Sequence, residues 1–445
     1  MDEINLTADQ QMAYDVILSG ANTFVTGGAG VGKTHLLRRV IAGLEEVGKN
    51  VLVCAPTGAA ASHIGGITVH RAFALPAGPC LTPKGSKIVA RTTDALRAAD
   101  VVIIDEVSMV RLDMMDAIKA SLDKIQSKYS KHIQLVVVGD FYQLPPVVTD
   151  KEREALEEYY GKSIRCAYAF LSPAWAALDF TPVLLSQVMR QQDPTYADIL
   201  NRLRIGDVTV LDYTNTHSAP KPIEGAIQLY PYNSQVERAN AKALDQIRDP
   251  MLAVIPVITD GDVPPGDCVA VLRLKKDARV LITANDTGRD ACVVVGDGRC
   301  RDRNKPLYYN GSTGRIMDIY RRPGSTTVEA LLIRLDNGPI ISMSRHSYPV
   351  YDYAVVDGRL VRNTIGHYHQ FPVVLAYAMS IHRAQGQTYD AYNVEPANYI
   401  PGLLYVALSH GRAIDKVHIK RWLRPSDIAV DEDVQALYSS FDADQ

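Results

Sequence analysis

A glycine-rich run near the N-terminus constrains the fold more strongly than any other feature of this chain. Residues 27–34 read GGAGVGKT and match the pattern G-x-x-x-x-G-K-[ST]. A short β-prone run, Thr23 to Thr26, precedes it, and apolar residues at helical spacing follow it at 36–44. Glycines in such a loop let backbone N–H groups close around phosphates, and the start of the next helix adds positive potential. The run therefore predicts a strand, a phosphate-binding loop and a helix within an α/β domain.

The side chains of this loop suit a nucleoside triphosphate held together with Mg²⁺. We expect Lys33 to reach the β- and γ-phosphates and Thr34 to supply a hydroxyl ligand to Mg²⁺. The backbone around Gly30 and Gly32 is expected to contact the phosphates. The alternative, a chance glycine-rich turn, is disfavoured by the strand before the loop and the helix after it. ATP and Mg²⁺ are therefore the predicted cofactors.

Two further strand-like runs end in polar residues suited to the same chemistry. Residues 101–106 read VVIIDE, and this run of β-branched residues is typical of a central parallel strand. We expect Asp105 to hold Mg²⁺ and Glu106 to be the general base that deprotonates the attacking water, which favours hydrolysis over transfer. A third run, 135–138, leads into GDFYQLPP, where Gln143 is placed to touch both the γ-phosphate and a ligand above the sheet.

Composition sets only wide limits on function. The 445 residues are 47% apolar and 22% charged with a net charge of −3, as in ordinary globular protein of two to four domains. A nucleic-acid partner would therefore need a local basic groove rather than an overall basic field. The sequence has no apolar run of roughly 18 residues, and its acidic N-terminus is no secretory signal. We therefore expect no membrane partner, and we expect the acidic tail from Asp427 on to be solvated or loosely packed.

Read in order, eight short motifs resemble those of superfamily-one helicases, most closely the Pif family of 5′-to-3′ DNA helicases, to which the phage Dda helicase is related. They run from Leu6 to Arg412 and read LTADQQ, GGAGVGKT, APTGAAASHIGGITVHRAF, IDEVSM, GDFYQLPPV, LSQVMRQ, SIHRAQGQT and YVALSHGR. The stretches GGITVH, GDFYQLPP and IHRAQGQT are specific to that part of the superfamily. The resemblance implies an ATP-dependent enzyme that moves 5′ to 3′ on single-stranded DNA and unwinds duplex DNA.

The resemblance also implies an architecture: α/β, with two RecA-like P-loop NTPase domains and two insertions. The first domain would cover residues 1–182 and carry a small wedge at about 74–98, for which a flexible surface loop is the alternative. The second would cover 183–271 and 372–445, around an SH3-like β insertion at 272–371. Strand-and-turn signals within that last range favour β structure independently.

Roles at the nucleotide follow from the same resemblance. Gln10 would contact the adenine, although Thr7–Gln10 is also a helix capping box. Gln385 and Gly386 would face the nucleotide cleft. Arg190, in LSQVMRQ, is the main candidate for an arginine that reaches the γ-phosphate from the second domain.

The segment YVALSHGR departs from the family pattern, because relatives carry an arginine where this chain has His410. An imidazole is shorter than a guanidinium, is only partly charged near neutral pH and lacks its fork of donors. Three outcomes stay open: Arg412 replaces the missing guanidinium, Arg190 suffices beside a weaker His410 contact, or hydrolysis is crippled. The last would make the chain a nucleotide-gated nucleic-acid clamp with little or no ATP turnover, which is the alternative to a helicase.

Five residues are assigned to nucleic acid by the resemblance: Thr57, Gly58, His70, Phe73 and His382. For Thr57 and Gly58 the alternative is an ordinary helix cap, for Phe73 it is core packing, and for His382 a structural role. The implied partners are single-stranded DNA and tailed duplex DNA, with single-strand-binding or replication proteins as candidates. We expect activity as a monomer in the cytoplasm of a bacterial or phage-infected cell; replication, recombination and repair all use such an engine.

Overall fold

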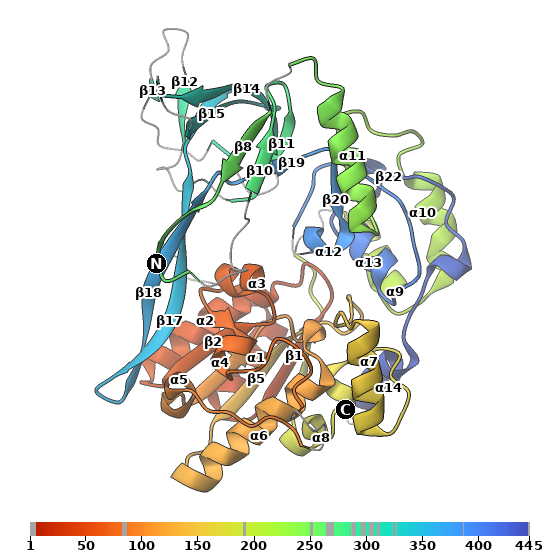
Figure 1. Cartoon of the computed structure of the whole chain (residues 1–445). Helices are drawn as coiled ribbons and strands as arrows, with labels where there is room; N and C mark the ends of the chain where they lie inside the picture. The colour runs from red at the N-terminus through yellow and green to blue at the C-terminus, as the bar shows by residue number, and fades with distance from the viewer. Residues whose placement is uncertain are drawn as a thin grey trace.

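The computed structural model shows two α/β units and a β-rich insertion, with the C-terminus lying beside the first unit (Figure 1). Within the part of the chain that is described, no helix is both long and apolar enough to cross a membrane. The structure describes residues 6–81, 87–189, 193–249, 252–263, 271–284, 286, 291–294, 300–301, 307–308, 312–322, 324, 327–385 and 387–443.

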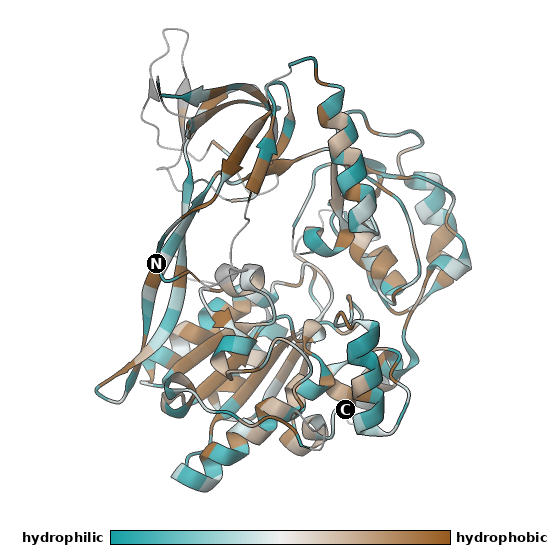
Figure 2. Cartoon of the chain, viewed as in Figure 1, coloured by the Kyte–Doolittle hydropathy of each residue, from teal (hydrophilic) through white to brown (hydrophobic). Residues whose placement is uncertain are grey.

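The first unit is built on a six-stranded parallel sheet in the order β3-β2-β4-β5-β1-β6. Its central strands are buried along their whole length because helices cover both faces, and Figure 2 shows them as the apolar centre of the unit. Neighbouring residues enter opposite cores: Phe24 joins the core under α6, and Val25 joins the core under α1 and α2. The strands are β1 Thr23–Gly27, β2 Val51–Ala55, β3 Ile67–Thr68, β4 Val101–Ile104, β5 Gln134–Gly139 and β6 Thr181–Leu185.

Helices of the first unit start where the sequence offers caps. The Thr7 hydroxyl accepts a hydrogen bond from the Gln10 N–H, and the Gln10 side chain accepts one from the Thr7 N–H. The predicted capping box is therefore confirmed. Thr149 and Glu152 form a second capping box. The helices are α1 Ala8–Leu18, α2 Lys33–Glu46, α3 Gly58–His63, α4 Val69–Ala72, α5 Asp94–Ala98, α6 Leu112–Tyr129, α7 Asp150–Tyr160 and α8 Pro173–Leu178.

The second unit has a smaller parallel sheet of four strands in the order β20-β7-β21-β22. Its chain is split, because the β-rich insertion separates β7 and α11 from β20. The strands are β7 Ile227–Tyr230, β20 Ala378–Ser380, β21 Tyr392–Val394 and β22 Val417–Ile419. The helices are α9 Pro194–Arg204, α10 Leu211–His217, α11 Asn233–Asp245, α12 Ile381–Ala384 and α13 Leu403–Leu408.

Antiparallel strands form the insertion. A seven-stranded sheet has the order β13-β12-β16-β15-β14-β11-β19, β8 pairs with β10, and β17, β18 and β9 form a third sheet. Ala253 packs in the same core as Leu331, so β structure begins before residue 272, where the sequence placed its start. The strands are β8 Ala253–Pro256, β9 Ile258–Gly261, β10 Val271–Leu274, β11 Arg279–Ile282, β12 Ala291–Val294, β13 Cys300–Arg301, β14 Thr313–Arg321, β15 Val328–Leu335, β16 Ile340–Met343, β17 His346–Val356, β18 Arg359–Gln370 and β19 Val373–Leu375.

The long hairpin β17–β18 reaches from the insertion down to the first unit (Figure 1). Tyr353 and Leu360 pack against the core of the first sheet. An ion pair of 3.1 Å joins Arg71, at the end of α4, to Asp352 on the hairpin. The insertion is therefore continuous with the second unit in sequence and docked on the first unit in space.

The C-terminal tail is a packed helix, so the expectation of a solvated tail was wrong. Helix α14 spans Glu432–Ala443 and lies on the first unit, where Val434 and Tyr438 join its core. Apolar residues at 434, 437, 438 and 441 share one helical face, and the acidic residues lie elsewhere on the helix. The tail's net acidity concealed this stripe. It also means that residues assigned to the second domain pack partly on the first.

The predicted wedge, at 74–98, is anchored at its base. Leu75 and Cys80 are buried in the first core, and the Cys80 N–H donates to the Asp113 carboxylate at 2.7 Å. Residues 82–86 lie outside the described residues. A strand-separating role for this segment stays a prediction.

Candidate nucleotide site and nucleic-acid interface

The phosphate-binding loop lies at the carboxyl end of β1, as its sequence predicts. Gly30 and Gly32 both have left-handed backbones, with φ of 84° and 83°, which an L side chain would adopt only at a cost. Gly32 caps helix α2 without any side-chain cap, so the first N–H groups of α2 remain available to an anion. A Cβ on Gly32 would lie 2.6 Å from Gln10, so the loop is also packed too tightly there for a larger residue.

Lys33 begins helix α2 with its ammonium folded over this loop. Its Nζ donates to the carbonyls of Gly27 at 2.8 Å and Gly28 at 3.0 Å. Burial lowers the pKa of Lys33, although the carboxylates of Asp140 and Glu106 act in the opposite direction. An ammonium group held by two carbonyls near carboxylates is well placed to bind a phosphate.

Asp105 and Glu106 follow β4 at the same edge of the sheet. Burial, followed by the charge of Glu106, raises the pKa of Asp105 to about 7. Glu106 has a left-handed backbone with φ 54°, and its N–H donates to the Asp105 carboxylate at 2.9 Å. A divalent cation would offset the cost of burying these adjacent carboxylates. The donor set, with the exposed Thr34 hydroxyl at the start of α2, therefore fits Mg²⁺.

Gln143 follows β5 and meets the second unit directly. Its Oε1 accepts a hydrogen bond of 3.0 Å from Nε2 of Gln385, which follows α12. Two glutamines that the sequence assigned to the nucleotide site therefore touch each other across the seam between the units. Gly386, also assigned to this site, lies outside the described residues.

A buried ion pair crosses the same seam, and sequence reasoning missed it. The guanidinium of Arg204, at the end of α9, donates to both carboxylate oxygens of Asp140 at 2.8 to 3.1 Å. Its central carbon lies 4.5 Å from the ring of Tyr142 and 5.1 Å from that of Tyr438. Burial alone would lower the pKa of Arg204, but the Asp140 charge raises it, so the cation persists. No motif marked Arg204, because one arginine on a surface-patterned helix carries no signal.

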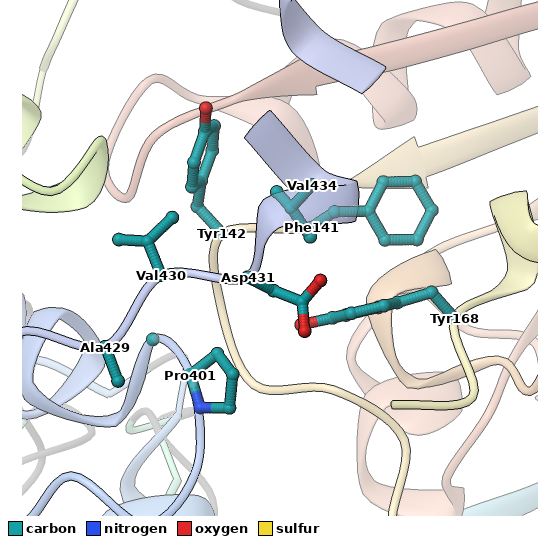
Figure 3. Close-up of a pocket in the computed structure, with 9 residues that line it drawn as sticks. Phe141, Tyr142, Tyr168, Pro401, Ala429, Val430, Asp431 and Val434 are labelled. Carbon is teal, nitrogen blue, oxygen red and sulfur yellow. The ribbon is translucent and has the colours of Figure 1, made fainter. Parts of the chain in front are cut away.

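Tyr405 makes a second contact that the sequence did not predict, although it lies within YVALSHGR. The backbone N–H of Ala29, in the phosphate-binding loop, donates to the Tyr405 hydroxyl at 2.7 Å. Tyr405 belongs to α13 and is buried in the core of the second unit. Figure 3 shows the neighbouring part of the seam, a small cavity lined by Tyr142, Pro401 and Val430 among others.

His410 and Arg412 both contact other residues of the second unit. His410 is buried, its Nδ1 lies 3.2 Å from the Gln387 carbonyl, and its ring packs edge-on against Tyr389 and Tyr392. Arg412 is half exposed and lies 3.9 Å from Asp390. In this arrangement neither side chain occupies the position expected of the family's arginine.

Arg190 lies outside the described residues, but the segment before it is tied to the nucleotide site. The Met189 N–H donates to the Gly30 carbonyl at 2.8 Å. The Asp9 carboxylate accepts the N–H of Ser186 at 2.7 Å and of Gln187 at 3.3 Å. Burial alone would raise the pKa of Asp9, but bonds from the Thr7 hydroxyl and these backbone groups lower it to about 2.

Gln10, assigned to the adenine, is fully buried between α1 and the loop. Its Nε2 donates to the Val31 carbonyl at 3.1 Å, and its Oε1 accepts the Thr7 N–H at the same distance. Its amide therefore braces the loop in this structure, and adenine contact stays a prediction.

Of the five residues predicted to contact nucleic acid, Phe73 does not fit that role. Its side chain is fully buried in the first core, because α4 turns Val69, Ala72 and Phe73 inward, so it cannot stack on a base. The Thr57 hydroxyl accepts the Ala60 N–H at 3.2 Å, which makes Thr57 a helix cap whose hydroxyl is partly exposed.

Gly58, His70 and His382 are each partly exposed. Burial lowers the pKa of His70 and of His382, which favours the neutral form of both rings. Neutral imidazoles can still donate a hydrogen bond to phosphate or sugar. They fit a DNA backbone contact, which stays a prediction.

Taken together, a phosphate cradle on one RecA-like sheet and contacts from a second RecA-like unit define a two-domain P-loop nucleoside triphosphatase. Comparison with known proteins names the family. A family model described as PIF1-like helicase matches residues 5–211. The ATP-dependent DNA helicase Pif1 of Bdellovibrio bacteriovorus is 30% identical over 452 residues, which covers 99% of this chain and 93% of that protein. The chain therefore belongs to the PIF1-like helicase family.

Further relatives agree with this assignment. The ATP-dependent DNA helicase PIF1 of Danio rerio is 29% identical, and the match covers 97% of this chain and 63% of that protein. A solved structure of Bacteroides Pif1 with ADP-AlF4 is similar with a TM-score of 0.82 at 28% identity, over 99% of this chain and 98% of that one. Bacteroides Pif1 bound to single-stranded DNA is similar with a TM-score of 0.65, at the same identity and coverage.

Proposed function

We propose that this ATP-dependent DNA helicase closes its two RecA-like units around ATP and converts that closure into 5′-to-3′ movement along single-stranded DNA. The observation that carries the proposal is the double contact of the second unit with the nucleotide site, through Arg204 on Asp140 and Tyr405 on Ala29. Tyr405 and Arg204 of the second unit both lie beside Gly28, whose carbonyl binds Lys33, so we expect phosphate binding and the position of the second unit to be coupled.

The first unit carries the chemistry in this proposal. Lys33 binds the β- and γ-phosphates, and the N–H groups around Gly30 and Gly32 hold the remaining phosphate oxygens. Thr34 and Asp105 would hold Mg²⁺, whose positive charge would neutralise the phosphates. Glu106 accepts the proton of the attacking water, and Gln143 orients that water from the seam.

The segment that links the two units, between β6 and α9, supplies positive charge at the moment of reaction in this proposal. We assign this role to Arg190, because the Met189 N–H next to it is already bonded to Gly30 in the loop. Arg412 can contribute only if it leaves Asp390 and turns towards the cleft. Gln385 and Gly386 line the nucleotide from this side, and Gln10 keeps its proposed place beside the adenine.

Single-stranded DNA would lie across both units, on Thr57, Gly58 and His70 of the first and His382 of the second. Bacteroides Pif1 has been solved bound to single-stranded DNA, and another similar structure comes from a study of unwinding at forked duplex DNA by two coordinating Pif1 helicases. We propose the same DNA partners for this chain. Action as a monomer, a cytoplasmic location, and single-strand-binding or replication proteins as partners stay predictions.

The clamp without turnover is not favoured. Its motivation was His410, but that residue is buried in the second core, whereas Lys33, Asp105 and Glu106 converge at one edge of the first sheet. The relatives are moreover named ATP-dependent helicases.

Displacement of streptavidin from biotinylated single strands tests the proposed movement. With ATP, the wild-type protein is expected to release streptavidin faster from a 3′-biotin strand than from a 5′-biotin strand. The Glu106→Gln variant is the matched control and should release neither. Faster release from the 5′ end would overturn the direction, and DNA-stimulated hydrolysis without release from either end would overturn translocation.

A further inference from the structure

Tyr405 places a phenol hydroxyl from the second unit on the phosphate cradle itself. The hydroxyl accepts the Ala29 N–H at 2.7 Å and would lie 3.4 Å from a Cβ built on Gly28. Lys33 donates to the carbonyls of Gly27 and Gly28, and the Gly28 carbonyl belongs to the same peptide group as the Ala29 N–H, which points to the opposite side. Backbone N–H groups of such a loop cradle phosphates, and the Ala29 N–H is one of the N–H groups of this loop.

The Tyr405 hydroxyl and a phosphate oxygen are chemically similar acceptors for one donor. A backbone N–H makes one good hydrogen bond at a time, and loop amides of this kind bind phosphate through that bond. When a nucleotide occupies the loop, its terminal phosphates therefore compete with the Tyr405 hydroxyl for Ala29.

The Tyr405 side chain cannot move independently of its helix and the second unit, because α13 is fixed at both ends. All six residues of α13 are buried in the second core, and Tyr405 itself is 3% exposed. The helix starts at Gly402, where an added Cβ would lie 2.3 Å from the Tyr142 carbonyl of the first unit. At its other end, the hydroxyls of Tyr196 and Tyr392 donate to the Leu408 carbonyl at 2.6 and 2.8 Å.

The surroundings of Tyr405 extend this coupling to the buried ion pair. Arg204 packs beside Tyr405 at the seam, and its guanidinium binds Asp140 of the first unit. A shift of the Tyr405 ring would press on a side chain that already joins the two units. A hydroxyl with a purely structural role would more simply find its partner within its own unit, as those of Tyr196 and Tyr392 do.

We propose that Tyr405 is a positioning residue that reports occupancy of the phosphate cradle to the second unit. Its hydroxyl holds the Ala29 N–H when the cradle is empty, and the terminal phosphates of ATP displace it, which frees α13 to move relative to the loop. This inference rests on the proposed function and deepens it, because it names a contact through which nucleotide binding changes the arrangement of the units.

Nucleotide affinity of Tyr405→Phe tests the inference. The variant keeps the ring and its packing and removes only the competing hydroxyl. The probe is β,γ-methylene-ATP with Mg²⁺, titrated without DNA, and we expect it to bind about three- to tenfold more tightly, which corresponds to the net worth of one hydrogen bond. Tyr392→Phe is the matched control, because it loses a buried hydroxyl bonded to α13 but not to the loop, and its affinity should equal that of the wild type.

The outcomes separate this inference from the function on which it rests. If the wild-type protein does not bind the probe, both are overturned. If the wild type binds it and Tyr405→Phe binds equally or more weakly, the proposed function stands and the Tyr405 inference is overturned. A structural role alone would lower the melting temperature of Tyr405→Phe without tightening its affinity, so thermal melting of both variants is measured in parallel.

Discussion

The two RecA-like units contribute to the nucleotide site in different ways. In the first unit, Lys33, Asp105 and Gln143 all follow strands, at the carboxyl ends of β1, β4 and β5. In the second, the groups that reach the cradle, Arg204 and Tyr405, project from helices α9 and α13. A parallel sheet gathers its strand-end residues at one edge whatever surrounds it. Helix side chains reach a distant site only through the packing of one unit on the other.

The difference indicates which changes should affect chemistry and which should affect coupling or stability. Strand-end residues of the first unit, together with Arg190, should determine the rate of the chemical step. Residues at the seam should determine how firmly the units hold each other. Four substitutions test this division, in order of decreasing expected effect.

Arg190→Ala should cause the largest loss of ATP hydrolysis, and Arg412→Ala is measured beside it for comparison. An arginine that contacts the γ-phosphate in the transition state contributes about a thousandfold or more, whereas Arg412 is half exposed beside Asp390. DNA-stimulated ATP hydrolysis is the measurement, and Arg412→Ala should lose less than about tenfold. A larger loss for Arg412→Ala than for Arg190→Ala would show that Arg412 replaces the family's missing arginine.

Glu106→Gln should lower the hydrolysis rate by at least about a hundredfold, because a general base contributes about that much or more. The amide keeps the shape of the side chain, so binding of β,γ-methylene-ATP should be retained. Steady-state hydrolysis and equilibrium titration of the same preparation distinguish the two effects. Hydrolysis at the wild-type rate would remove Glu106 as the base.

Arg204→Ala should lower the free energy of unfolding by about 3 kcal/mol, because it leaves the buried carboxylate of Asp140 without its cation. Arg202→Ala is a matched control on the same helix, since Arg202 pairs with Asp207 at the surface and should be close to wild type. Urea unfolding measures both. Equal stabilities for the two variants would mean that the seam pair contributes nothing beyond a surface contact.

Asp9→Asn should have the smallest effect, and the effect should depend on pH. The pKa of Asp9 is lowered to about 2, so its stabilising contribution is fully present above about pH 4 and is lost as the pH falls towards 2. The difference in melting temperature between wild type and Asp9→Asn should therefore shrink across that interval. A difference that is constant with pH would mean that the carboxylate charge does not hold Ser186 and Gln187.

The same contrast explains how much the sequence could predict. The phosphate-binding loop, the strand of Asp105 and the capping box of Thr7 are local patterns, and each appears where the pattern placed it. Phe73 was misassigned because one aromatic in a motif does not reveal which side of a short helix faces the core. Tyr405 and Arg204 were missed because their partners, Ala29 and Asp140, are far away in sequence.

Boundaries were the least predictable part of the fold. Helix α14 returns to the first unit because Val434 and Tyr438 complete its core, and an acidic composition gives no hint of such a return. The β-rich region begins at Ala253 rather than 272, because β8 pairs with β10. Both differences arise from long-range packing rather than from local propensity.

Strand displacement on two tailed duplexes tests the central claim, that closure of the two units on ATP drives 5′-to-3′ unwinding. One duplex carries a 5′ single-stranded tail and the other a 3′ tail, and Glu106→Gln serves as the inactive control. The account predicts ATP-dependent opening of the 5′-tailed duplex alone. Opening of the 3′-tailed duplex alone would contradict the direction, and opening of neither by protein that binds DNA and ATP would contradict the claim itself.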